Sequence, residues 1–226
     1  MKKHLVVLTG AGMSAESGIK TFRDADGLWE GHDVMEVATP EGFAANPELV
    51  LDFYNQRRKQ LFEVKPNGAH IDLAKLEDNF KVTIITQNVD DLHERAGSTN
   101  VIHLHGELLK ARSSYDEKDI QKWKTDLVLG DLCQKGHQLR PHIVWFGEDV
   151  PMIESAVEIC KTANVLIIIG TSMQVYPAAS LMHYAPEKTP TYFIDPKPNI
   201  GSKENLTVIA ERATVGVTKL TEFLTS

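Results

Sequence analysis

The chain has 226 residues, of which 42% are hydrophobic and 24% are charged. These proportions allow a buried core and predict one domain, or one large domain with a small insert. The formal net charge is −7 and no basic run is present, so nucleic acid is not an expected partner. A mildly acidic chain weakly favours basic partners, such as lysine-rich protein segments.

Cysteine content and hydropathy exclude several other classes of protein. Cys133 and Cys160 are too few and too far apart for a disulfide framework or a four-cysteine metal site. The N-terminal segment lacks the long apolar region of a secretory signal, and no apolar run approaches the ~20 residues that span a membrane. We therefore expect a cytoplasmic monomer with no membrane partner.

Short apolar runs bounded by turn residues predict the strands of the fold. In chain order they cover residues 4–9, 81–86, 164–169, 191–194 and, more weakly, 206–209. Helical patterns lie at residues 47–62, 69–78, 151–161, 177–184 and 213–224. The first of these follows Asn46 as N-cap and has Pro47 at its first position. Apolar strands that alternate with helices predict an α/β fold with a Rossmann-like, doubly wound parallel sheet.

Two stretches do not fit this alternation. Residues 110–140 are polar with weak periodicity, and residues 32–65 carry only a helical pattern. We expect these two inserts to fold together as a small domain. The large Rossmann-like domain then comprises residues 1–31, 66–109 and 141–226.

A glycine-rich segment, Gly10-Ala11-Gly12-Met13-Ser14-Ala15, follows the first predicted strand and matches G-x-G-x-x-A. Glycines there permit a tight turn and a close approach of the backbone to a pyrophosphate, and this context favours dinucleotide binding over a plain turn. An ordinary dehydrogenase would place a second strand, ending in an acidic ribose ligand, within ~30 residues. Here the next strand begins at Lys81, and the intervening loop carries Phe22 and Arg23. This arrangement suits a segment that closes over a cofactor whose bond is broken.

Polar residues follow three of the predicted strands. In a doubly wound sheet, ligands bind beyond the carboxyl ends of the strands. The three segments are residues 86–91, 170–172 and 195–197. A helix N-cap with an acidic first turn would explain Asp90 or Asp91, but not Gln87 and Asn88 ahead of them. A plain turn would explain Gly170-Thr171-Ser172 taken alone. Beside the glycine-rich segment, the three together indicate one ligand site.

His103 and His105 alternate, so on an extended segment their side chains share a face. Histidine exchanges protons near neutral pH, which makes either ring a candidate base. A hydrogen-bonded structural histidine and a paired-histidine zinc site are the alternatives. Zinc is disfavoured because no third ligand stands at a recognisable spacing.

Five segments of the chain resemble the sirtuin family, in the order in which that family carries them. They are GAGMSAESGIKTFRDADGLW (10–29), TQNVDDLHERAGS (86–98), HLHGEL (103–108), RPHIVWFGE (140–148) and GTSMQVYPAA (170–179). The resemblance spans most of the chain. It implies a Rossmann-like domain with a small domain, NAD⁺ as co-substrate, and an acyl-lysine protein or peptide bound between them.

The resemblance also implies the residues of the cofactor site. These are Gly10, Ala11, Gly12, Ala15, Thr21, Phe22, Arg23, Trp29, Gln87, Asn88, Asp90, Gly170, Thr171, Ser172, Asp195 and Ala213. The family usually has Asn where Asp195 stands. His105, directly before Gly106, corresponds to the catalytic base, with Asn88 and Asp90 near the nicotinamide ribose.

The implied reaction moves the acyl group of a lysine onto ADP-ribose. The acyl oxygen attacks C1′ of the nicotinamide ribose, nicotinamide leaves, and His105 accepts a ribose hydroxyl proton. Water then completes the release of lysine and O-acyl-ADP-ribose. The substrate peptide is expected as an added strand between two loops. The expected contacts are Val144, Trp145, Phe146 and Gly147 on one side and Val175, Tyr176 and Pro177 on the other.

Tyr54 and Arg57 are three residues apart on a predicted helix, so they share a face and could together hold a carboxylate. On spacing alone, a helix-face tyrosine and a solvated arginine beside Arg58 is the simpler interpretation. The bacterial class III-like sirtuins, which remove succinyl and malonyl groups, resemble this chain in the Tyr-x-x-Arg pattern. They also share a small residue at the position of Ala38. We therefore hypothesise desuccinylase or demalonylase activity beside deacetylase activity.

Most sirtuins hold a structural zinc with two Cys-x-x-Cys pairs in the small domain. Here residues 110–114 read Lys-Ala-Arg-Ser-Ser, and only Cys133 and His137 stand near the second pair. Two ligands fall short of the four that a closed zinc site needs, so zinc is not expected. The degenerate zinc-ribbon-like module must then be held by packing, for which the candidates are Trp123, Leu127 and Leu132.

Three other functions are compared with this one on the sequence. A mono-ADP-ribosyltransferase on the same scaffold would share the cofactor segments. An inactive NAD⁺-binding sensor is disfavoured because His105, Asn88 and Asp90 are retained. A dehydrogenase is disfavoured by the missing early second strand.

Overall fold

The computed structural model describes residues 2–20, 28–29 and 31–226, so the predicted cofactor residues Thr21, Phe22 and Arg23 lie outside the described residues. Its largest sheet has six strands in the order β11-β10-β9-β1-β4-β5, and all neighbouring pairs are parallel. The strands are β1 (His4–Thr9), β4 (Lys81–Thr86), β5 (Val101–His103), β9 (Val165–Ile169), β10 (Thr191–Ile194) and β11 (Leu206–Ile209). The predicted doubly wound α/β fold is confirmed.

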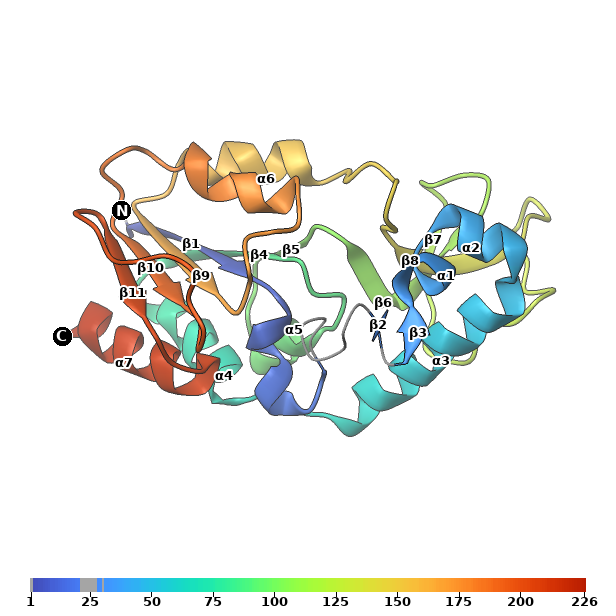
Figure 1. The fold of residues 1–226 in the computed structure, drawn as a ribbon, viewed down its shortest axis with the longest axis horizontal. Coiled ribbons are helices and arrows are strands. Elements are labelled where there is room, and N and C mark those ends of the chain that lie inside the picture. Colours follow the sequence, from blue (N-terminus) through green and yellow to red (C-terminus); the bar gives the residue numbers. More distant parts are fainter. Residues whose placement is uncertain (1, 21–27, 30) are drawn as a thin grey trace.

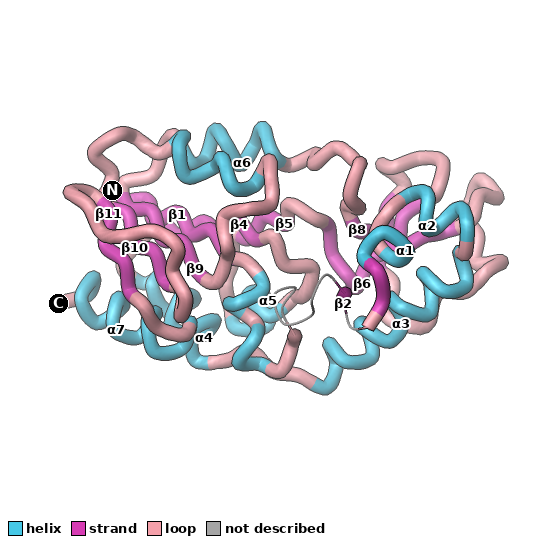
Figure 2. The backbone as a smooth tube through the Cα atoms, viewed as in Figure 1, coloured by secondary structure: helices cyan, strands magenta, loops and turns pink. Residues whose placement is uncertain are grey.

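Helices cover both faces of this sheet, which forms the middle layer in Figures 1 and 2. One face carries α4 (Gly68–Lys75) and α7 (Ala213–Thr225), and the other carries α6 (Ile153–Cys160) and the 3-10 helix η5 (Ala178–Tyr184). Leu5 and Val7 of β1 pack with α4 and α7. Val6 and Leu8 pack with α6 and η5. Because successive side chains of a strand point to opposite faces, an uninterrupted apolar run is buried on both sides.

The helix predictions are confirmed in position but differ in detail. The predicted helix at residues 177–184 is the 3-10 helix η5, which begins at Ala178, rather than an α-helix, and residues 151–152 form a turn before α6. Residues 76–78 continue α4 as a 3-10 turn. The long helix α3 (Pro47–Glu63) begins as expected, with the Asn46 side chain accepting a hydrogen bond from the backbone N–H of Leu49. A membrane-spanning helix is not found among the described residues.

A second module lies at the end of the molecule away from α7 (Figure 1). Its antiparallel sheet has the order β7-β6-β8, formed by β6 (Gly106–Ser113), β7 (Ile120–Lys122) and β8 (Leu139–Ile143). Beside the sheet lie α1 (Val34–Val37), α2 (Pro40–Ala45), α3, and the short strands β2 (Leu28–Trp29) and β3 (His32–Asp33). These strands were not predicted, since β7 is exposed throughout and β6 mixes polar and apolar residues. The domain boundaries stay a prediction.

Packing between α3 and the polar insert involves two of the three expected residues. Leu127 is fully buried with Leu51 of α3, and Trp123 packs against the same cluster. The side-chain amide of Asn55 also donates to the Leu127 carbonyl at 3.0 Å and accepts from its N–H at 2.8 Å. The expectation for Leu132 is wrong, because its side chain is 54% exposed.

Candidate active site

The glycine-rich segment folds as two 3-10 turns, η1 (Ala11–Met13) and η2 (Ala15–Ser17), rather than as the start of a long helix. The N–H of Gly12 donates to the carbonyl of Gly170 at 2.8 Å. A Cβ atom on Gly12 would lie 2.7 Å from the Cα of Gly170, which itself has a φ of +60°. Glycine is therefore required here by close packing of two backbone segments. The two segments that sequence reasoning assigned to one ligand are in contact.

Asn88 and Asp90, which follow β4, both bind the hydroxyl of Ser14 in the glycine-rich segment. The Ser14 Oγ donates to Asp90 Oδ2 at 2.9 Å and accepts from Asn88 Nδ2 at 3.1 Å. All three side chains are buried, and burial raises the pKa of Asp90. The other Asp90 oxygen accepts from the N–H of Leu92, the first residue of α5 (Leu92–Ala96), whose N-cap is Asp91. Sequence reasoning missed Ser14 as a separate site residue, although it lies inside the G-x-G-x-x-A match.

Gln87 connects the end of β4 to the end of β9. Its Nε2 donates to the hydroxyl of Thr171 at 3.1 Å, and Thr171 is buried. Asp195, after β10, is buried and accepts from the N–H of Lys197 at 2.8 Å. Hydrogen bonds thus join the carboxyl ends of β1, β4 and β9, the edge at which such a sheet binds ligands.

His105 lies between β5 and β6, and its Nδ1 is 3.1 Å from the backbone oxygen of Gln87. A carbonyl oxygen only accepts hydrogen bonds, so Nδ1 carries the proton and Nε2 of the neutral ring holds a free lone pair. Burial lowers the pKa of His105, which favours this neutral form. The ring therefore has the tautomer and the charge state of a general base.

His103 makes a similar contact with the backbone of Asn88, the residue after Gln87. Its Nδ1 is 3.0 Å from the Asn88 backbone oxygen, and its Nε2 is 2.8 Å from a carboxylate oxygen of Glu94. Burial opposes protonation, but the hydrogen bond and charge of Glu94 raise the pKa of His103 overall. His103 thus fits the alternative of a hydrogen-bonded structural histidine. Together, the two histidine rings contact the backbone oxygens of Gln87 and Asn88.

The two expected peptide loops are exposed at their tips. Phe146 is 47% exposed, Val175 is 40% exposed and Tyr176 is 74% exposed. Backbone hydrogen bonds join Val144 N–H to the His105 oxygen and Phe146 N–H to the Ala38 oxygen, each at 2.9 Å. The loop around Phe146 therefore lies beside both the candidate base and the small residue Ala38.

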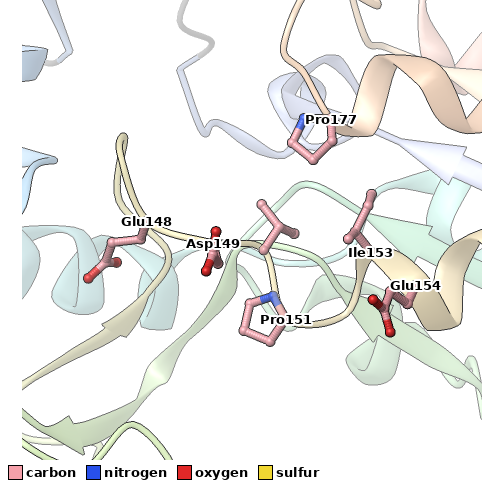
Figure 3. Close-up of a pocket in the computed structure, with 7 residues that line it drawn as sticks. Glu148, Asp149, Pro151, Ile153, Glu154 and Pro177 are labelled. Carbon is pink, nitrogen blue, oxygen red and sulfur yellow. The ribbon is translucent and has the colours of Figure 1, made fainter.

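An open pocket of about 510 Å³ adjoins these loops (Figure 3). Its lining residues are Glu148, Asp149, Val150, Pro151, Ile153, Glu154 and Pro177. Glu148 directly follows one expected peptide-binding segment, and Pro177 is the last residue of the other. The pocket is therefore a continuation of that surface and not the glycine-rich site.

Tyr54 and Arg57 lie on α3 as predicted, but neither matches the simpler interpretation of a solvated helix face. Tyr54 is fully buried and its hydroxyl accepts a 2.9 Å hydrogen bond from Trp145 Nε1. Burial raises the pKa of Tyr54, so the phenol keeps a hydrogen to donate. The Arg57 guanidinium lies 4.9 Å from the centre of the Phe53 ring, with Nε and Nη1 buried and unpartnered. Two buried, unpartnered donors on a partly buried cation are suited to a carboxylate.

The remaining predicted site residues lie next to the residues described above. Trp29 packs edge-on against Phe53 and Tyr54, at ring-centre distances of 4.8 and 5.9 Å. Ala213 begins α7 and is buried. The N–H of the next residue, Thr214, donates to the Glu16 carboxylate at 2.9 Å. Ala15 begins η2, Gly147 has a φ of +89° in an exposed turn, and Ser172 is half-buried after Thr171.

Residues near the expected zinc position make other contacts. The Cys133 thiol lies 3.7 Å from the Ser113 hydroxyl, and the His137 ring stacks on Tyr115 with ring centres 4.5 Å apart. Across the part of the chain that the structure describes, no group of three or more His, Cys, Asp or Glu side chains is arranged to hold a metal ion.

Comparisons with known proteins agree with this geometry. The model of the Sir2 family matches residues 10–177. The chain is 62% identical to an NAD-dependent protein deacylase of Helicobacter pylori, over 93% of each protein. It is 55% identical to an NAD-dependent protein deacylase of Bacteroides thetaiotaomicron, over 98% of each. Among solved structures, a Sir2 homolog in complex with NAD superposes with a TM-score of 0.87 at 40% identity, covering 99% of this chain and 90% of that one.

Proposed function

Because this chain belongs to the Sir2 family, we propose that it is an NAD-dependent deacylase that removes acyl groups from lysine side chains of proteins. The observation that carries the proposal is the tautomer of His105. Its Nδ1–H is held by the Gln87 carbonyl, so Nε2 is free to accept a proton. In the proposed role, Nε2 takes the proton of a ribose hydroxyl and so makes that oxygen a nucleophile.

The residues at the carboxyl edge of the sheet fit a dinucleotide. Gly12 and Gly170 bring two backbone segments together without side chains between them. The side-chain amides of Gln87 and Asn88 and the buried carboxylate of Asp90 lie directly beside that contact, and such groups suit ribose hydroxyls. When bound, NAD⁺ supplies the ribose that receives the acyl group and the nicotinamide that leaves. The protein residues orient that ribose and move its proton.

The acyl-lysine peptide is proposed to lie between the Phe146 loop and the loop that holds Val175 and Tyr176. Exposed backbone and apolar side chains on both loops are suited to an added strand. Backbone recognition of this kind tolerates many flanking sequences. The hydrogen bond from the Val144 N–H to the His105 backbone oxygen keeps the peptide loop at a fixed distance from the base.

We further propose that the preferred acyl groups include succinyl and malonyl. Arg57 offers Nε and Nη1 without partners, and the Tyr54 hydroxyl has a hydrogen to donate. A carboxylate at the end of the acyl chain would satisfy both. Ala38, which is small and buried near Phe146, leaves room for the longer chain.

The decisive experiment incubates the full chain with NAD⁺ and acetyl-, succinyl- or malonyl-lysine peptides and identifies products by mass spectrometry. A deacylase releases nicotinamide, free lysine peptide and O-acyl-ADP-ribose in equal amounts. Attachment of ADP-ribose to protein without loss of the acyl group would instead indicate a mono-ADP-ribosyltransferase. The variant His105→Ala is expected to bind NAD⁺ and to lose deacylation, and full activity in that variant would contradict the assignment of the base.

A further inference from the structure

Glu148 is the acceptor in a buried cluster that the proposed chemistry does not use. Its two carboxylate oxygens each lie 3.0 Å from Nη2 of Arg112. They also accept from Arg140 at 2.5 and 3.1 Å, and one accepts from the backbone N–H of Trp145 at 2.8 Å. The three charged side chains are only 4%, 8% and 14% exposed, for Arg112, Arg140 and Glu148 respectively. Burial opposes ionisation, but the two arginines and the Trp145 N–H lower the pKa of Glu148 overall.

The two arginines need this carboxylate because they are direct neighbours across the small sheet. Arg112 of β6 and Arg140 of β8 are partners in the antiparallel register. Like charges opposite each other destabilise a strand pair, and buried like charges do so strongly. Glu148 stands between them and pairs with both. The carboxylate thus stabilises the place where β8 leads into the Phe146 loop.

The same carboxylate closes the turn of that loop. Glu148 N–H donates to the Trp145 oxygen at 3.1 Å, and the Glu148 side chain accepts from the Trp145 N–H, so the turn is bonded from both ends. The Arg140 guanidinium lies 3.3 Å from the centre of the Trp145 ring. The indole Nε1–H of Trp145 donates to the Tyr54 hydroxyl. A continuous set of contacts therefore runs from Glu148 through Trp145 to Tyr54.

We propose that Glu148 is a positioning residue for the acyl end of the substrate site, acting through Trp145 on the Tyr54 hydroxyl. This inference rests on the proposed deacylase function. Figure 3 shows the Glu148 carboxylate directed away from Pro151 and Pro177 in the neighbouring pocket. The carboxylate therefore fixes the loop by its contacts with Arg112 and Arg140 rather than by touching the peptide.

The test compares Glu148→Gln, which keeps the shape and removes the charge, with Glu148→Asp, which keeps the charge. Steady-state constants are measured for NAD⁺ and for succinyl- and acetyl-lysine peptides. Glu148→Gln is expected to raise the KM for the succinyl peptide about tenfold, equivalent to ~1.4 kcal/mol of binding. The KM for NAD⁺ stays within about twofold of the wild type. Glu148→Asp recovers part of the loss. A fall in kcat with unchanged peptide KM would mean a purely structural role and would overturn the inference.

A double-mutant cycle with Tyr54→Phe tests whether Glu148 acts through the Tyr54 hydroxyl. If Glu148 acts through Tyr54, then Glu148→Gln has no further effect on the succinyl-to-acetyl ratio in the Tyr54→Phe background. Additive effects would overturn the inference. Trp145→Phe removes the indole N–H together with part of the buried ring system, and it carries the test if Glu148→Gln does not fold. An unchanged ratio in that variant is the contrary result. Asp126→Asn, which breaks the exposed pair with Lys59, is the matched control.

The outcomes separate this inference from the function on which it rests. No deacylation of any peptide by the wild type would refute the proposed function. Deacylation of acetyl but not succinyl peptide would refute the acyl preference, and the peptide KM of Glu148→Gln on the acetyl peptide would then decide the role of Glu148.

Discussion

The hydroxyl of Ser14 donates a 2.9 Å hydrogen bond to the Asp90 carboxylate, which joins residues 76 positions apart in the sequence. The same oxygen accepts from Asn88, so one hydroxyl satisfies two buried polar groups from the next strand end. The glycine-rich segment is thereby fixed to the β4 end. This contact explains why a small polar residue, and not only glycine, is needed in that segment.

Ser14→Ala is expected to weaken both NAD⁺ binding and the fold. The change leaves Asp90 Oδ2 and Asn88 Nδ2 without this partner, at a cost of about 1–3 kcal/mol for each buried group. We expect a rise in the NAD⁺ dissociation constant, measured by calorimetry below the unfolding transition, together with a clear fall in melting temperature. Ser114→Ala, at an exposed serine, is the control. Unchanged NAD⁺ affinity would argue that the Ser14 bridge does not shape the nucleotide site.

The pH dependence of deacylation is expected to follow His105. Burial lowers the pKa of this imidazole below its ordinary value of 6.5. Only the neutral ring accepts a proton, so activity is present above that pKa and is lost as the pH falls through it. The acid limb of a single-turnover rate profile should therefore have its midpoint below pH 6.5. A midpoint well above 7 would indicate that another group, such as His103, controls the step.

Much of the main sheet could be predicted from the sequence because its strands are continuous apolar runs. The strands β1 and β9 are buried along their whole length, so their composition alone identifies them. The strand β5 was missed because it has three residues and all are only half-buried. The strands of the small sheet were missed because their stability depends on partners rather than on an apolar face. The register that pairs Arg112 with Arg140 is an example, since only the distant Glu148 makes it favourable.

The site could be predicted where the residues form one contiguous motif, and not where burial decides the role. Arg57 and Arg58 are adjacent, and composition does not distinguish them. In the fold, Arg58 is 1% exposed and binds the Leu108 carbonyl and Asn55, whereas Arg57 keeps unpartnered donors. The direction of a side chain on a helix, and the groups that face it from other elements, are tertiary facts. Sequence spacing placed Tyr54 and Arg57 on one face but did not reveal the Trp145 contact.

Acid is expected to destabilise the folded chain through its buried histidines. Burial lowers the pKa of His70 and of His142 to about 4, and it lowers the pKa of His93 well below 6.5. The rings of His70 and His93 lie 4.8 Å apart, so protonating one disfavours protonation of the other. Because the unfolded chain binds these protons more readily, the free energy of unfolding is largest above pH 6.5 and falls between pH 6.5 and 4.

Replacing one of these histidines tests that linkage. Because burial lowers the pKa of His70 to about 4, this residue alone is expected to contribute on the order of 3 kcal/mol across the window. Urea unfolding at a series of pH values is expected to show a shallower pH slope for His70→Gln than for the wild type. His183→Gln at an exposed histidine of η5 is the comparison. Identical slopes for His70→Gln and wild type would contradict the assignment.

Arg57→Met separates substrate recognition from stability. The guanidinium is partly buried with Nε and Nη1 unpartnered, so replacing it with an apolar chain of similar length is expected to keep or raise the melting temperature. If those donors bind the acyl carboxylate, the variant loses charge-assisted hydrogen bonds worth about 1.5–3 kcal/mol, or about 10- to 100-fold in kcat/KM for succinyl-lysine. Acetyl-lysine, which has no carboxylate, should be turned over nearly as before. Lys59→Met, on the same helix and exposed, is the control. Equal losses on both peptides, or a clear fall in melting temperature, would mean that Arg57 serves the fold rather than the acyl chain.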